Sequence, residues 1–174
     1  MEKARRDALR AVVNKTRRSV EESLERQLSA FGLSCKSTPI PREDLALHPA
    51  QEALYPRLLD AVRRQGRAVG ADGQITPQAV TRFVRETGGT WINRLAALRA
   101  LEARGLLAPA AAFVADEYGG GSPRAARIRE EAAAKGKTLT RDEALRAGIE
   151  SACRELSENV GVLFDLTDEQ SLLW

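Results

Sequence analysis

Every apolar segment of this chain repeats with the period of an α-helix. In the first segment, apolar residues recur at spacings of three, four and seven: Leu9, Val13, Val20, Leu24, Leu28 and Phe31. This spacing places them on one face of a long helix, whereas a half-buried strand alternates at every second residue. No segment shows a credible strand pattern. The sequence therefore predicts an all-α protein, a multi-helix bundle.

Proline and glycine indicate where these helices begin and end. A basic amphipathic helix is expected over residues 1–32, and a proline-rich connector over residues 33–49. The single histidine, His48, falls in this connector and is predicted to be a loop residue rather than a catalytic one. A second helix is expected from about residue 50 to residue 65, and residues 50–158 as a whole are expected to form the helical core.

Capping residues predict the remaining helices. The Thr76–Pro77 pair is typical of a helix start, and we expect that helix to stop at Gly88–Gly89. Thr90 is then the expected N-cap of a separate helix, which ends at Gly105. Three further helix starts are expected, at Ser122 before Pro123 and at two capping boxes, Thr140 with Glu143 and Thr167 with Gln170.

The length and composition are those of one globular domain over residues 1–174. The chain is 43% hydrophobic and 29% charged, which is enough to bury a core. Its longest uncharged apolar run, residues 106–115, is too short to span a bilayer, and its first residues are charged where a signal peptide would be apolar. We therefore expect no membrane association and a cytoplasmic location. Cys35 and Cys153 are expected to be reduced thiols, and no metal site is predicted.

Positive charge gathers in two regions, although the net charge is only +3. Residues 1–18 hold seven basic and two acidic residues, and residues 57–104 hold nine arginines and four acidic residues. Such regions are typical either of contact with a polyanion or of solvated helix faces. If they bind DNA phosphates, the expected contacts are Arg5, Arg6, Arg17, Arg18, Arg63, Arg64 and Arg67.

Residues 90–107 place charges within an apolar helix surface. At about 100° per residue, Trp91, Leu95 and Leu98 share one face. Glu102 falls inside this face, and Arg94 and Arg99 lie on its two borders: a buried helix tolerates such charges only when they are paired or hydrogen bonded.

The same stretch carries a family resemblance. It resembles the Trp-Phe-Asn-Arg-Leu-x-Ala-Leu-Arg-Phe-Met-Glu signature of BREX phage-defence adenine-specific DNA methyltransferases, the PglX group, and related fused restriction-modification enzymes. The matching residues are Trp91, Asn93, Arg94, Leu95, Ala97, Leu98, Arg99 and Glu102. The sequence departs from the signature at Ile92, at Ala100–Leu101 and at Gly88–Gly89, positions that concern core packing more than polar chemistry.

The resemblance implies an enzyme that transfers a methyl group from S-adenosylmethionine to the N6 atom of adenine in a specific DNA sequence. Its partners would be DNA and other phage-defence subunits. In that family the helical region precedes a Rossmann-like methyltransferase domain, with a glycine loop for the cofactor and an Asn/Asp-Pro-Pro-Tyr/Phe motif for the flipped adenine. This chain has neither motif, and the Gly-Gly-Gly-Ser stretch at 119–122 follows no predicted strand. We therefore predict no catalytic, cofactor-binding or metal-binding residue here, and read residues 159–174 as the start of a link into a missing catalytic domain.

The signature residues have two interpretations. In the structural one, Arg99 pairs with Glu102 while Asn93 and Arg94 reach main-chain carbonyls or a neighbouring helix. In the functional one, Asn93, Arg94 and Arg99 contact DNA phosphates or the absent catalytic domain. Three hypotheses for the chain follow: an inactive N-terminal fragment of the methyltransferase, a free-standing basic nucleic-acid-binding protein, or a partner-docking helical bundle.

Overall fold

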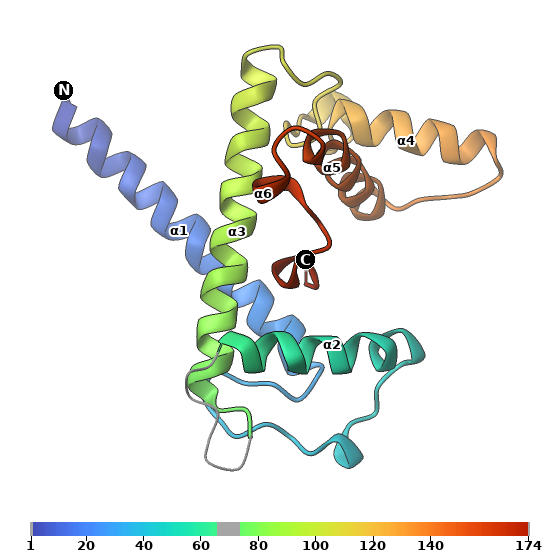
Figure 1. Ribbon diagram of the computed structural model, residues 1–174. Coiled ribbons are helices and arrows are strands. Elements are labelled where there is room, and N and C mark those ends of the chain that lie inside the picture. Colours follow the sequence, from blue (N-terminus) through green and yellow to red (C-terminus); the bar gives the residue numbers. More distant parts are fainter. Residues whose placement is uncertain (1, 66–73, 174) are drawn as a thin grey trace. The chain divides into compact units, whose positions relative to one another are not determined.

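The chain forms six α-helices in the part that the structure describes (Figure 1). The structure is a computed structural model that describes residues 2–65 and 74–173. Its α-helices are α1 (Glu2–Ser29), α2 (Pro49–Gln65), α3 (Pro77–Ala103), α4 (Pro123–Ala134), α5 (Arg141–Ser157) and α6 (Gly161–Phe164). Three short 3₁₀ helices are η1 (Arg42–Asp44), η2 (Asp116–Tyr118) and η3 (Glu169–Ser171). Within the described residues there is no strand, only an isolated bridge between Ala115 and Gly121, so the all-α prediction is confirmed.

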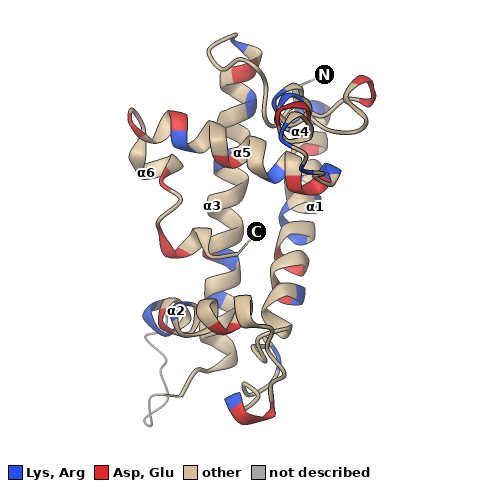
Figure 2. Ribbon diagram, turned by 90° about the vertical axis from the view of Figure 1, so that its right-hand side faces the viewer, with Lys and Arg blue, Asp and Glu red and all other residues tan. Residues whose placement is uncertain are grey.

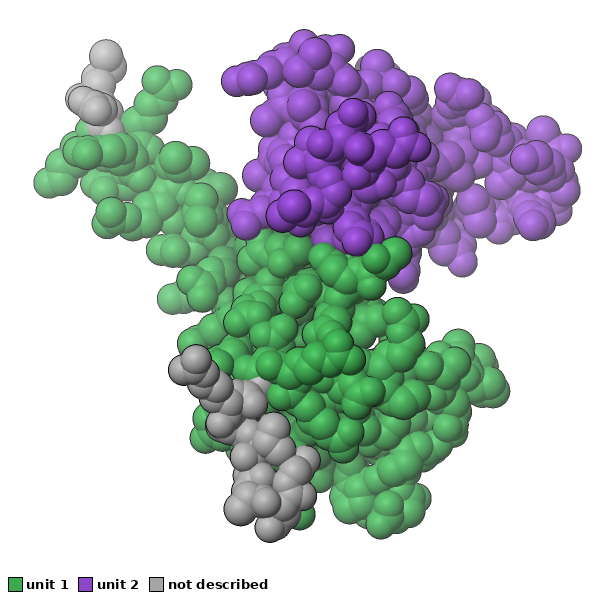
Figure 3. Space-filling model, in the orientation of Figure 1, with its two compact units in different colours: residues 1–92, 167–174 green, residues 93–166 purple. Residues whose placement is uncertain are grey.

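The chain divides into two compact units (Figure 3). Unit 1 comprises residues 1–92 and 167–174, and unit 2 comprises residues 93–166. The boundary falls inside α3, so this helix supplies residues to both units. Among the described residues, no helix has the length and apolar character that crossing a membrane requires.

The core of unit 1 is apolar and lies between α1, α2 and the first half of α3. It also includes Leu173, near the C-terminal end of the described chain. The buried side chains are Leu24, Leu28, Phe31, Leu33, Leu58, Ala61, Val62, Ile75, Ala79, Val80, Phe83, Val84 and Leu173. The helical spacing in α1 thus buries side chains only from Val20 onward, since residues 3–19 are exposed throughout.

Unit 2 is built on α4, α5 and α6 together with the second half of α3. The buried apolar residues are Leu98, Leu107, Ala111, Ala125, Ala144, Ile149, Ala152, Cys153 and Phe164. Small residues let α4 and α5 come close, because a Cβ added at Gly148 would lie only 3.4 Å from the main-chain nitrogen of Ala125.

The predicted break at Gly88–Gly89 is wrong. These glycines, and Thr90 after them, lie inside the continuous helix α3, so Thr90 is not an N-cap. Glycine in a helix interior costs about 1 kcal/mol relative to alanine, which packing can offset. Phe83, Val84 and Trp91 are buried on either side, and a Cβ at Gly88 would contact Val20 and Leu24 of α1. Tertiary packing therefore overrides the local signal.

The other capping predictions have different outcomes. Gly105 ends α3 as expected, with φ of 70° and a hydrogen bond from the Leu106 amide to the Leu101 carbonyl. The Ser122 cap and the Thr140–Glu143 capping box are also confirmed. The Thr167–Gln170 box is wrong, because residues 169–171 form a 3₁₀ turn whose N-cap is Asp168.

Candidate functional site

Arg94 is the most deeply buried charged residue of the signature. Its side chain is on α3, belongs to unit 2, and is 0% exposed. Its Nε atom donates to the main-chain oxygen of Leu163, and its Nη2 atom donates to that of Asp165, both at 2.7 Å. The rigid guanidinium fork suits such a pair of acceptors, because two N–H groups point the same way. Arg94 therefore holds the C-terminal end of α6 and the residue after it.

Glu102 holds the loop that follows α3. Its side chain is 3% exposed, and its Oε1 atom accepts hydrogen bonds from the amides of Ala111 and Ala112, each at 2.7 Å. Its Oε2 atom pairs with Arg99 Nη1 at 2.7 Å. Arg99 is 45% exposed and also lies over the ring of Phe113, 4.8 Å from the ring centre. The expected Arg99–Glu102 pair is present, and the other carboxylate oxygen accepts from the main-chain amides of buried Ala111 and half-buried Ala112.

Arg124 is a second buried arginine in unit 2, and the sequence did not indicate it. Its Nε atom donates to the Pro109 carbonyl at 3.0 Å, and its Nη1 atom pairs with Glu155 at 2.9 Å. Glu102 and Arg124 thus hold the same loop, one through its amides and the other through a carbonyl. Arg124 directly follows the Ser122–Pro123 helix start. A residue in the first turn of a helix is ordinarily solvated, so the hydrophobic periodicity of the sequence did not indicate that Arg124 is buried.

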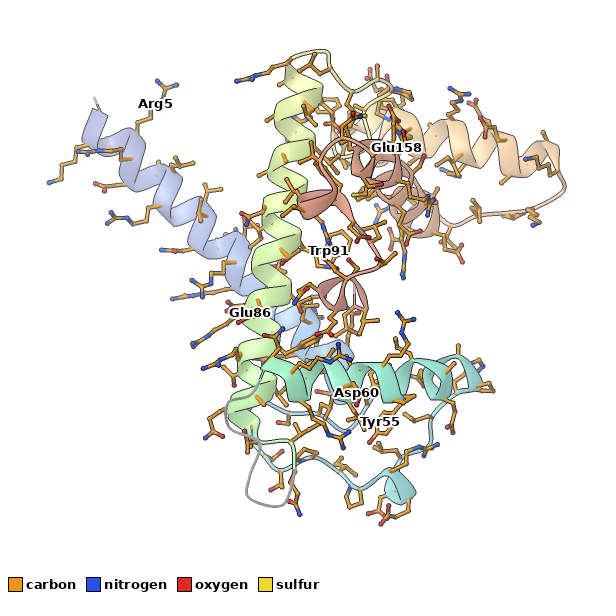
Figure 4. All side chains as sticks on the ribbon, in the orientation of Figure 1. Arg5, Tyr55, Asp60, Glu86, Trp91 and Glu158 are labelled. Atoms are coloured by element: carbon orange, nitrogen blue, oxygen red, sulfur yellow. The ribbon has the colours of Figure 1, made fainter. Side chains whose placement is uncertain are left out.

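Trp91 and Asn93 are the remaining signature residues whose side chains carry polar groups. Trp91, which Figure 4 labels, is buried in unit 1, and its indole Nε1 atom donates to the Leu173 carbonyl at 2.9 Å. Asn93 is exposed, and the structure gives it no carbonyl or helix partner. Of the signature's polar side chains, Asn93 and the outer part of Arg99 are therefore the ones that solvent or a partner can reach.

The residues expected to contact DNA are not gathered in one place. Arg5, Arg6 and Arg18 are exposed on α1, and Arg17 beside them pairs with Glu21 at 2.8 Å. On α2, Arg63 lies 3.4 Å from Asp60, and Arg64 pairs with Glu169 of η3. Within unit 1, the N-terminal end of α1 extends away from α2 (Figure 1). Arg67 lies outside the described residues.

The cysteines and the histidine have structural surroundings. Cys35 and Cys153 are free, and burial raises the pKa of both thiols. The charge of Arg94 partly opposes that rise at Cys153. His48 is an exposed connector residue just before α2, as predicted. In the described ranges, no group of three or more His, Cys, Asp or Glu side chains is arranged to hold a metal ion.

The glycine cluster at 119–121 forms a tight turn. Gly119 and Gly120 have φ of 63° and 73°, values that side chains other than glycine rarely adopt. The turn is closed by a hydrogen bond from the Ala115 amide to the Gly121 carbonyl, at 3.1 Å. It leads directly to the Ser122 cap of α4, so its local geometry is that of a connection between η2 and α4.

Comparisons with protein-family models, with curated proteins and with solved structures found no match to this chain.

Proposed function

We propose that this chain is the helical N-terminal region of a site-specific adenine-N6 DNA methyltransferase of a BREX or restriction-modification type of phage defence. It is inactive alone and works in the cytoplasm, with DNA and other defence subunits as partners of the whole enzyme. The resemblance of residues 90–107 to the family signature supports this proposal. This chain has no Asn-Pro-Pro-Tyr motif and no strand with a glycine loop in its described part, so the proposal assigns methyl transfer to another part of the enzyme.

One contact carries the proposal. The signature residue Arg94 binds the carbonyls of Leu163 and Asp165, which belong to residues 159–174, the segment expected to link to the catalytic domain. A buried charge with such contacts is costly to leave unpaired, so Arg94 fixes the conformation of this stretch. The role we propose for the signature is therefore to hold the segment from which the catalytic domain would follow.

The decisive observation is the reading frame beyond codon 174. The proposal expects a following strand with a glycine loop for S-adenosylmethionine and an Asn/Asp-Pro-Pro-Tyr/Phe motif. Downstream DNA that encodes neither motif would overturn it. In the whole protein, Arg94→Ala should reduce N6-methyladenine in cellular DNA, whereas Arg129→Ala, which removes an exposed arginine of α4, should not.

A second candidate function is direct, sequence-independent contact with DNA phosphates through α1. The supporting observation is that Arg5, Arg6 and Arg18 are exposed and have no ion-pair partner among the described residues. Such binding should be weak, with a dissociation constant of about 10⁻⁴ to 10⁻⁶ M at physiological salt, and steeply salt dependent.

Four substitutions test this second candidate. Replacing Arg5, Arg6, Arg17 and Arg18 with alanine should lower the affinity for a DNA duplex and flatten its dependence on salt. The matched control removes four exposed arginines of unit 2, namely Arg127, Arg129, Arg141 and Arg146. Equal effects from both sets would mean that binding depends only on the net charge of the chain. An unchanged dependence of the affinity on salt concentration would exclude α1 from the interface.

A further inference from the structure

The first half of α1 presents an uncovered apolar row. Leu9, Val12 and Val13 are 65%, 61% and 49% exposed. The row lies at helical spacing in line with Val20, which is partly buried, and Leu24, which is 2% exposed in the core. The face that α1 uses to pack in unit 1 therefore continues beyond that core without a covering element among the described residues.

An exposed row of this kind is typical of a helix-docking surface. Apolar side chains at spacings of three and four form the seam along which two helices pack. Most of the stability of a helix in a protein comes from packing of its apolar face, so a partner that covers the row stabilises the helix as well. We name residues 3–19 of α1 the docking helix, and the side chains of Leu9, Val12 and Val13 its apolar row.

Arginines along one edge of the row indicate the chemistry of the partner. At about 100° per residue, Arg6, Arg10 and Arg17 follow this edge, while Asp7 lies on the opposite face. Arg17 already pairs with Glu21, but Arg6 and Arg10 are exposed and the described residues give them no ion pair. Figure 2 shows the basic residues spaced along this part of α1. The complementary surface has carboxylates beside an apolar stripe.

We propose that the docking helix binds an amphipathic helix of another protein, whose apolar stripe covers Leu9, Val12 and Val13 and whose flanking carboxylates pair with Arg6 and Arg10. The proposal does not depend on the methyltransferase assignment. Phosphates of a nucleic acid would pair with the arginines but leave the apolar row in water. Helices that lie on membranes commonly carry Trp, Phe or Leu on the apolar face, whereas this row has one leucine and two valines.

The test uses the whole chain and two synthetic helical peptides. Both have leucine and valine at the seam positions of a two-helix coiled coil, one with glutamate beside the seam and the other with lysine at the same positions. Binding is followed by fluorescence anisotropy of the labelled peptide. We expect the glutamate peptide to bind and the lysine peptide not to bind.

Two variants separate the apolar from the charged part of the surface. Leu9→Ser with Val13→Ser should weaken glutamate-peptide binding by about tenfold or more. Arg6→Glu with Arg10→Glu should exchange the preference, so that the lysine peptide now binds. The matched control, Ala4→Ser with Ala11→Ser, changes two exposed residues on the opposite face and should bind like the unmodified chain.

Four results would overturn the proposal. One is failure of the glutamate peptide to bind, and another is full binding by the Leu9→Ser, Val13→Ser variant, since charge alone would then suffice. A third is that these serines abolish binding to anionic phospholipid vesicles or to a DNA duplex and spare the peptide. The fourth is a dimer in sedimentation velocity that the same serines dissociate, because the row would then be occupied by a second copy of the chain.

Discussion

Glu102 and Arg99 form an ion pair whose two members have unequal surroundings. The carboxylate is almost fully buried and accepts two main-chain hydrogen bonds besides the one from Arg99. The guanidinium is nearly half exposed and lies over Phe113. The ion pair alone suggests that the two residues contribute equally to stability. The structure instead makes Glu102 the residue on which the loop after α3 depends.

Alanine substitutions should therefore differ in cost. We expect Glu102→Ala to reduce the free energy of unfolding by about 1–3 kcal/mol, because it leaves the amides of buried Ala111 and half-buried Ala112 without their acceptor. Arg99→Ala should cost less than about 1 kcal/mol, since its partner keeps both main-chain donors and the pair is partly solvated. Urea unfolding of the two variants measures this difference. Equal costs would contradict the assigned roles.

Two glycines, Gly89 inside α3 and Gly105 just after it, should respond oppositely to substitution by alanine. Gly89 is helical and a Cβ there would meet no atom within 4 Å, so Gly89→Ala should stabilise the protein by about 0.5–1 kcal/mol. Gly105 has φ of 70°, so Gly105→Ala should destabilise it by about 1 kcal/mol. Thermal unfolding of both variants tests the pair. If Gly89→Ala also destabilises, the helix is interrupted at Gly89 as well.

The capping box of α5 makes helix stability depend on pH. Hydrogen bonds from the Thr140 amide and then from its hydroxyl lower the pKa of Glu143 below its ordinary value. Because the folded-state pKa is the lower one, this stabilisation is present above the ordinary carboxyl pKa and is lost as pH falls through the folded-state value. Glu143→Gln should therefore flatten the acid limb of stability against pH. An unchanged acid limb would contradict this, with Glu158→Gln, outside the box, as the control.

The sequence predicted a helix end correctly where the hydrogen bonds of that end involve only residues close in sequence. The Ser122 cap, the Thr140–Glu143 box and the Gly105 stop each depend on neighbouring residues only, and each was predictable. The continuity of α3 through Gly88 was not, because it depends on packing against α1, more than 60 residues earlier in the chain. The Thr167 box failed for the same reason, since residues 169–173 follow the unit 1 core rather than their own helical signal.

The polar residues of the candidate site were predictable in part. Charges within the apolar face of residues 90–107 indicated buried partners, and Arg94 and Glu102 have them. Which atoms they bind was not predictable, because Leu163 and Asp165 lie about 70 residues away and are reached through their main chain. Arg124 could not be found at all, since its partner Pro109 belongs to a loop with no periodic pattern.

The sequence of unit 2 is inserted into that of unit 1: the chain passes from unit 1 to unit 2 within α3, and residues from 167 onward belong to unit 1 again. The returning segment joins the unit 1 core through Leu173, which is buried and whose carbonyl accepts the Trp91 hydrogen bond. Arg64 of α2 also pairs with Glu169. Unit 1 is therefore completed only by residues that come after unit 2 in the sequence.

This topology predicts which unit a substitution at Leu173 will destabilise. Leu173→Ala should reduce stability by about 2–5 kcal/mol, as for other buried leucines, and Leu172→Ala by less because Leu172 is only partly buried. Amide hydrogen exchange should show the loss of protection around Leu28 and Phe83 in unit 1, with the amides of α5 in unit 2 changed least. An equal loss in α5 would mean that the two units unfold as one. Unchanged exchange at Leu28 and Phe83 would mean that the segment at 167–173 does not complete the core of unit 1.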